Sequence, residues 1–145
     1  SPEDPHWQSE IFPDMCSQFK PGSDLNITTC DIKPGGDLVI DVLSPHAEAG
    51  TYDIVLAPDL SGEWWDVQKN TTGSNVVAQN LADLMIRMLP LVKPGGVLLC
   101  SKFVYTDAET VVATLDQNPK INASVVTYNL NDFDFKFAAI HVPSD

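Results

Sequence analysis

Residues 89–103, LPLVKPGGVLLCSKF, contain the helix-to-strand junction that decides the fold. The Lys-Pro-Gly-Gly turn at 93–96 ends a helical pattern, and the apolar run that follows it, 97–105, is typical of a buried strand. The preceding segment, 74–92, has the spacing of an amphipathic helix with Ser74 or Asn75 as its N-cap. Its predicted buried face consists of Val77, Leu81, Leu84, Met88 and Leu91.

Further elements are predicted on both sides of this junction. Downstream, 106–119 is predicted as a helix capped by Thr106 or Asp107 with Glu109 in its first turn. Segments 123–130 and 135–142, joined by the polar link NDFD, predict two adjacent antiparallel strands. Upstream, the apolar runs 25–32, 37–43 and 51–58 are typical of buried parallel strands, and 6–19 has helical spacing interrupted by Pro13.

This alternation of helices and buried strands predicts an α/β fold: a Rossmann-like, mostly parallel sheet with an antiparallel terminal strand. The chain has 145 residues, 43% of them hydrophobic, which suits one domain over residues 1–145.

Charge and hydropathy limit the partners. Eight Lys and Arg against 20 Asp and Glu give a net charge of −12, so RNA could bind only through a local basic patch or a basic partner chain. No apolar run approaches the roughly 18 residues of a membrane span, and no signal peptide is recognisable. Cys16, Cys30 and Cys100 lack CxxC spacing and are predicted to be buried free thiols, so we expect a soluble protein of the reducing cytoplasm.

The 89–103 junction resembles the fourth-helix to fifth-strand segment of class I S-adenosylmethionine-dependent methyltransferases. Together with YDIVLAPDLSG at 52–62 and the terminal strand pair, it makes roughly residues 27–142 resemble the FtsJ-type RNA 2′-O-methyltransferases. The resemblance implies a Rossmann-like fold with a reversed last strand, S-adenosylmethionine as cofactor, and RNA as substrate.

Cofactor and catalytic residues follow from this resemblance. Asp31 matches the acid near the cofactor's ribose or methionine side, and Asp41 matches the acid that faces the adenine amino group. The alternative for each is an aspartate that caps a turn or a helix. Pro58 occupies the position of the family's catalytic aspartate, and Asp59 follows it. The resemblance therefore implies Asp31, Asp41 and Pro58 at the cofactor and Asp59 as a catalytic residue.

The family's catalytic lysine matches Ser101, and Lys102 follows it, so the same one-residue shift occurs in two strands. Neighbouring residues of an extended chain point to opposite sides, so two β-bulges would be needed to bring Asp59 and Lys102 into the catalytic positions. The family's second lysine and its glutamate have no confident match, and Lys136 stands where the last strand might supply the acid.

The family's first strand and its glycine-rich cofactor loop have no counterpart before the helix at 6–19. Two explanations remain open. The sequence is a piece of a larger polypeptide, or the domain has lost its cofactor loop. In either case we expect the chain by itself to bind the cofactor weakly or not at all.

Ser61, Trp64 and Trp65 are predicted to form a substrate loop in which the tryptophans stack on a base or a cap guanine. Covering an apolar surface or a partner interface is an equal alternative. His6, His46 and His141 are scattered, so no metal site is predicted.

Three functions remain open. The first is an RNA methyltransferase domain that uses Asp59 and Lys102. The second is a non-catalytic, methyltransferase-like scaffold within a larger assembly, such as a viral replication or capping protein. The third is another Rossmann-type nucleotide-binding domain. The shifted catalytic positions, the missing loop and the acidic surface favour the scaffold over catalysis by the isolated chain.

Overall fold

A computed structural model describes residues 10–22, 26–44, 51–58, 62–130 and 132–144. The chain divides into two compact units, Ser1–Val42 and Leu43–Asp145, and each is described by itself.

In its described residues, the first unit contains one short helix and two very short strands. Helix α1 (Phe12–Ser17) is shorter than the predicted segment 6–19, of which residues 6–9 lie outside the described part of the chain. Strands β1 (Cys30–Asp31) and β2 (Leu38–Val39) pair in parallel, so the strands predicted over 25–32 and 37–43 are reduced to two residues each.

In this unit, hydrogen bonds that involve side chains take the place of the backbone hydrogen bonds that longer strands would form. The Thr29 amide donates to the Asp37 carboxylate at 2.8 Å, and the Asp37 amide donates to the Thr29 hydroxyl at 3.0 Å. These bonds occupy backbone groups that a longer strand pair would use.

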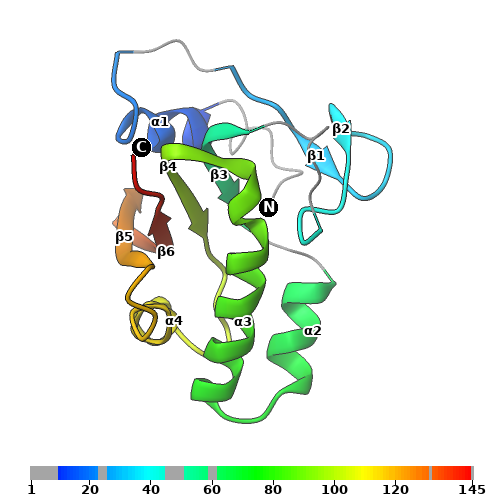
Figure 1. Cartoon of the computed structure of the whole chain (residues 1–145), viewed down its shortest axis with the longest axis vertical. Helices are drawn as coiled ribbons and strands as arrows, with labels where there is room; N and C mark the ends of the chain where they lie inside the picture. Colours follow the sequence, from blue (N-terminus) through cyan, green and yellow to red (C-terminus); the bar gives the residue numbers. More distant parts are fainter. Residues whose placement is uncertain (1–9, 23–25, 45–50, 59–61, 131, 145) are drawn as a thin grey trace. The chain divides into compact units, whose positions relative to one another are not determined.

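The second unit is built on a four-stranded sheet in the order β3-β4-β6-β5. Its strands are β3 (Tyr52–Ala57), β4 (Val92–Cys100), β5 (Asn122–Leu130) and β6 (Phe133–His141). Strands β3 and β4 are parallel, whereas β6 runs antiparallel to both β4 and β5. Three strands therefore share one direction and the last is reversed between two of them, which confirms the predicted α/β class (Figure 1).

Helix α3 (Ser74–Met88), extended by the 3-10 turn η3 (Leu89–Leu91), confirms the predicted central helix. All five residues of its predicted apolar face are buried. The predicted cap was wrong, because Gly73 precedes the helix with φ 93° and the Ser74 hydroxyl instead hydrogen-bonds that of Thr106 at 2.9 Å.

Two more helices accompany α3. Helix α4 (Ala108–Leu115) begins after Asp107, one of its two predicted caps, and packs against α3, β5 and β6. Helix α2 (Glu63–Asn70) lies beside α3 (Figure 1) and was not predicted, because the sequence after β3 was interpreted as a loop.

The predicted Lys-Pro-Gly-Gly turn lies within β4, where it interrupts the pairing with β3. Tyr52 pairs with Val92 and Ile54 with Val97, so the intervening residues of β4 bulge out. A Cβ atom on Gly96 would stand 2.6 Å from the Asp53 carbonyl oxygen, so only glycine fits here. The same four residues at 33–36 precede β2, and a Cβ on Gly36 would stand 3.1 Å from the Thr29 hydroxyl oxygen.

The four residues of β4 from Val97 to Cys100 are all buried, as expected for a strand covered on both faces. Burial raises the pKa of the Cys100 thiol far above its usual range, which agrees with the predicted buried thiol. The prediction was wrong for Cys30, which is exposed on the two-residue strand β1, while Cys16 is partly exposed. None of the described helices is both long enough and apolar enough to cross a membrane.

Candidate functional site

The ends of β3 and β4 form the centre of the candidate site, since parallel strands present their carboxyl ends at one edge. Ala57 and Cys100 are paired there. The Ser101 amide donates to the Ala57 carbonyl oxygen at 3.3 Å, and the Ser101 hydroxyl donates to the Pro58 carbonyl oxygen at 3.0 Å. The side chain at the family's lysine position is therefore turned towards the end of β3, where it joins the two loops.

Lys102 follows directly and leaves the strand direction. The strand predicted over 97–105 ends at Cys100, and Lys102 has φ 72°, in the left-handed region that residues with a side chain seldom adopt. The pairing of β4 with β3 is continuous from Val97 to Cys100, so the left-handed residue itself, and not a second bulge next to it, sets the direction of the backbone at Lys102.

Of the predicted site residues between β3 and α2, only Pro58 is within the described part of the chain. Asp59 and Ser61 lie outside the described residues, while Pro58 is placed beside Ser101 by the hydrogen bond above. The structure therefore brings Pro58 and the start of the Lys102 loop together, and the relation of Asp59 to Lys102 remains a prediction.

The two tryptophans lie in the first turn of α2 and not in a loop. Trp64 is 2% exposed, its ring centroid is 5.6 Å from that of Phe103, and its buried indole nitrogen has no hydrogen-bond partner. Trp65 is 44% exposed, with its ring centroid 6.1 Å from that of Tyr105. Of the pair, only Trp65 presents its ring at the surface.

Gln68 of α2 is the residue of this region that the sequence analysis missed. It is buried, and its amide hydrogen-bonds the backbone of residues 102–105. The signal would have been its position four residues after Trp64, on the same helical face, had α2 been recognised.

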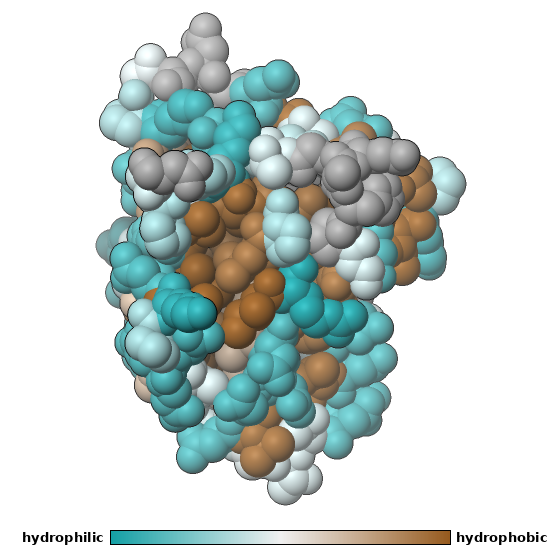
Figure 2. Space-filling model, viewed as in Figure 1, coloured by the Kyte–Doolittle hydropathy of each residue, from teal (hydrophilic) through white to brown (hydrophobic). Residues whose placement is uncertain are grey.

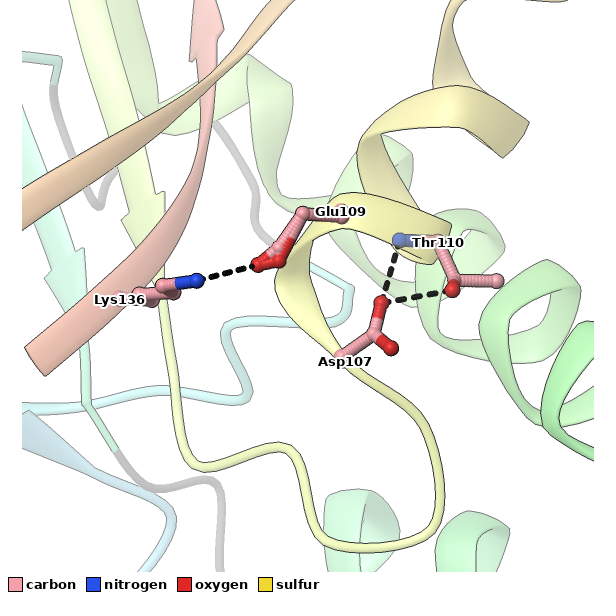
Figure 3. Close-up of polar contacts among 4 residues, drawn as sticks. All are labelled: Asp107, Glu109, Thr110 and Lys136. Atoms are coloured by element: carbon pink, nitrogen blue, oxygen red, sulfur yellow. Dashed lines mark hydrogen bonds and ion pairs between the residues drawn. The ribbon is translucent and has the colours of Figure 1, made fainter.

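The neighbouring strand and helix add paired charges, drawn in Figure 3. Lys136 of β6 forms an ion pair with Glu109 of α4 at 3.0 Å. Asp107 accepts hydrogen bonds from the hydroxyl and amide of Thr110 at 2.6 and 2.7 Å, and these bonds, with a smaller contribution from Lys136, lower the pKa of its carboxyl group. Lys136, at the position where the last strand might supply an acid, is thus a cation with a carboxylate partner.

Asp31 and Asp41 belong to the first unit, and their placement relative to Lys102 is not described. Both are exposed, and the pairing of Asp31 with Val39 puts Asp41 two residues beyond that partner. One oxygen of Asp31 accepts the Lys33 amide at 3.2 Å, as in the turn-capping alternative. Exposed carboxylates accept hydrogen bonds from hydroxyl and amino groups such as those of a ribose and an adenine.

The resemblance also implies a glycine-rich loop at the methionine end of S-adenosylmethionine. Before Asp31 the described residues include one glycine, Gly22, so they provide no glycine-rich loop that could approach a carboxylate closely. Within the described ranges, no three His, Cys, Asp or Glu side chains are grouped as a metal site would require.

No protein-family model matches the chain, and no curated protein matches it. The chain is similar to the crystal structure of the N-methyltransferase NodS from Bradyrhizobium japonicum WM9, with 15% sequence identity and a TM-score of 0.47, over 79% of this chain and 72% of that one. A likeness of this degree does not establish an activity.

Proposed function

We propose that the chain is an S-adenosylmethionine-dependent methyltransferase-like domain, derived from a methyltransferase that acts on an RNA cap or ribose 2′-hydroxyl group. The observation that carries the proposal is the junction of Pro58 and Ser101 at the carboxyl edge of β3 and β4. The hydrogen bond joins the first residues after the two strands that match the family's catalytic segments, in a sheet whose last strand is reversed as the resemblance implies.

In this proposal each residue has a defined task. S-adenosylmethionine, when bound, supplies a methyl group on a sulfonium sulfur. The carboxylates of Asp31 and Asp41 would hold its ribose and adenine side, as the resemblance implies. Lys102 lowers the pKa of the acceptor hydroxyl group, and Asp59 helps to orient that hydroxyl. The cofactor would supply its methyl group to the oxygen of this hydroxyl, whose proton would leave to solvent.

RNA binding by this chain should be weak because its net charge is −12. Lys102 and the half-exposed ring of Trp65 are the local features that could hold a nucleotide, by charge and by stacking. A basic partner chain within a larger assembly would supply the rest of the attraction.

A non-catalytic interaction module is the second candidate. The observation that favours it is the group of exposed hydrophobic side chains at 65, 104 and 105, of which Val104 is 54% exposed. Figure 2 also shows a continuous hydrophobic area at the centre of the viewed face, beside α3, whereas the surface over the lower ends of α2 and α3 is mostly hydrophilic. Other protein domains would be the partners in this case.

A titration with S-adenosylmethionine, monitored by amide NMR and by calorimetry, tests the proposal. We expect a dissociation constant of about 0.1–1 mM, because only the ribose and adenine side is held. Asp41→Asn should weaken binding about tenfold, the loss of one charge-assisted hydrogen bond. Asp116→Asn, which changes an exposed carboxylate at the end of α4, should leave binding unchanged.

Each other outcome has a meaning. The absence of any shift at millimolar ligand would contradict the cofactor site and favour the interaction module. A low-micromolar constant would contradict the expected weakness and favour an active enzyme. Equal binding of ATP and S-adenosylmethionine would favour a general nucleotide-binding domain.

A further inference from the structure

Gln68 is buried, with 1% of its surface exposed, although glutamine is usually a surface residue. A polar side chain is stable in such a place only when its hydrogen-bonding groups are satisfied. The partners of Gln68 come from one short segment, the backbone that follows β4. Its side-chain nitrogen donates to the Lys102 carbonyl oxygen at 3.0 Å. Its side-chain oxygen accepts the Val104 amide at 2.6 Å and the Tyr105 amide at 3.2 Å.

The Gln68 side chain supplies hydrogen-bond partners to the backbone of residues 102–105, as a neighbouring strand does for the backbone of β4. The segment lies beyond the last residue paired with β3 or β6, so its backbone groups need other partners. Trp64, one turn before Gln68 on the same side of α2, packs on Phe103 within the same segment. Helix α2 therefore holds the segment through the hydrogen bonds of the Gln68 side chain and the packing of the Trp64 ring.

The hydrogen bonds of Gln68 are made to a segment whose backbone is strained at Lys102. Lys102 has φ 72°, which is unfavourable for a residue with a Cβ atom and persists only when its surroundings enforce it. The Gln68 amide bonds the carbonyl of Lys102 and the amides of the second and third residues after it, so it closes the chain around this left-handed turn.

We propose that Gln68 is a positioning residue for Lys102: through three backbone hydrogen bonds it fixes the left-handed turn that determines where the Lys102 side chain leaves the edge of the sheet. The proposal rests on the proposed function in giving Lys102 a chemical task. Gln68 also relates the two segments of the candidate site to each other. Its helix, α2, begins at Glu63, four residues after Asp59 in the sequence, and its side chain hydrogen-bonds the loop that carries Lys102.

The test compares Gln68→Met, which keeps the size of the side chain and removes its hydrogen bonds, with Gln68→Glu, which keeps the acceptor and removes the donor. The matched control is Gln79→Met, because Gln79 is an exposed glutamine of α3 that bonds Asp83 at 3.2 Å. In the whole chain, NMR measures hydrogen exchange at Val104 and Tyr105. The backbone coupling and Cβ shift of Lys102 report its φ.

In Gln68→Met we expect exchange at Val104 and Tyr105 to accelerate about tenfold or more, and the Lys102 signals to move to values of negative φ. Gln68→Glu should accelerate exchange less, because its carboxylate can still accept both amides. Gln79→Met should change neither measurement. Unchanged Lys102 signals in both Gln68 variants would overturn the proposal, and the Glu variant keeps the test decisive if the Met variant does not fold.

A methyl-transfer assay on a capped oligonucleotide separates this proposal from the proposed function. If Gln68 acts through Lys102, Gln68→Met lowers kcat about tenfold without changing KM for S-adenosylmethionine. Adding Gln68→Met to Lys102→Ala should then cause no further loss. An additive loss would overturn the positioning role. If the parent chain transfers no methyl group, the catalytic tasks proposed for Lys102 and Asp59 fail in the isolated chain, while the NMR measurements still decide whether Gln68 positions Lys102.

Discussion

The hydroxyl group of Ser101 donates a hydrogen bond of 3.0 Å to the carbonyl oxygen of Pro58. The bond joins the residue after β4 to the residue after β3, which are 43 positions apart in the sequence. The next residue, Lys102, is exposed and is the first cation after the end of β4.

Removing this hydroxyl group should loosen the edge of the sheet. We expect Ser101→Ala to lower the free energy of unfolding by about 1 kcal/mol, because the partly buried Pro58 carbonyl loses its donor. The control is Ser74→Ala, whose hydroxyl contact with Thr106 is exposed and should contribute less than about 0.5 kcal/mol. Urea unfolding measures both, and equal effects would mean that the bond to Pro58 has no special role.

Gly96 should be the glycine of β4 that is hardest to replace. In Gly96→Ala the new Cβ would lie 2.6 Å from the Asp53 carbonyl oxygen and 2.9 Å from that of Lys93, and neither backbone atom can move without disturbing the strands. We expect a loss of about 3 kcal/mol or more in stability.

Gly95→Ala is the matched control for this clash. Gly95 has φ 81°, and the atom nearest to a new Cβ is the Ser144 hydroxyl oxygen at 3.1 Å, which can rotate away. Only backbone strain of about 1–2 kcal/mol remains. Urea unfolding measures both variants. A larger loss of unfolding free energy in Gly95→Ala than in Gly96→Ala would contradict the steric argument.

Asp107 should make the stability of α4 depend on pH. Its carboxyl pKa is lowered in the folded chain by the Thr110 hydroxyl and amide groups, so protonation favours the unfolded chain. The stabilisation is present above the ordinary aspartate pKa of about 3.9 and is lost as the pH falls through the lower folded value.

Asp107→Asn separates the charge from the capping bond, because asparagine caps helices as well as aspartate does. At about pH 6 this variant should be slightly less stable than the parent, and below about pH 3 the difference should vanish. Asp107→Ala should cost about 1 kcal/mol at about pH 6. Urea unfolding at both pH values measures these differences in the free energy of unfolding. If parent and Asp107→Asn differed by the same amount at both pH values, the charge of Asp107 would not be the source of the stabilisation.

The sequence predicted the second unit well because its elements have strong local periodicity. The buried face of α3 recurs every three or four residues, and β5 and β6 are adjacent apolar runs with a short link. Helix α2 was missed because it has eight residues, no side-chain cap, and a buried glutamine where a periodic pattern would have an apolar residue. The strands near Asp31 were overestimated because β-branched composition was taken as a sign of burial that the two-residue strands do not have.

The candidate site was predictable only in its location. Parallel strands direct their carboxyl ends to one edge, so the loops after β3 and β4 could be assigned to the site from sequence. The direction of Lys102 could not be, because its left-handed turn depends on Gln68, 34 residues earlier in the chain. Contacts of that range leave no trace in local periodicity.

Lys102 should be a residue whose replacement separates stability from function. In Lys102→Gly the strain of the left-handed backbone disappears, whereas Lys102→Ala keeps it, so we expect the glycine variant to be more stable than the alanine variant by about 1 kcal/mol. Both variants remove the amine that the proposed reaction requires. Both should therefore lower methyl transfer to a capped RNA oligonucleotide by about a hundredfold or more.

Two measurements on the same pair of variants check this expectation: urea unfolding for the backbone and single-turnover methyl transfer for the amine. Lys69→Ala, which removes an exposed lysine from the last turn of α2, serves as the control and should leave methyl transfer within about threefold of the parent. If Lys102→Gly transfers methyl groups as fast as the parent, the amine has no catalytic task. The strained turn would then serve only to shape the loop that Gln68 holds.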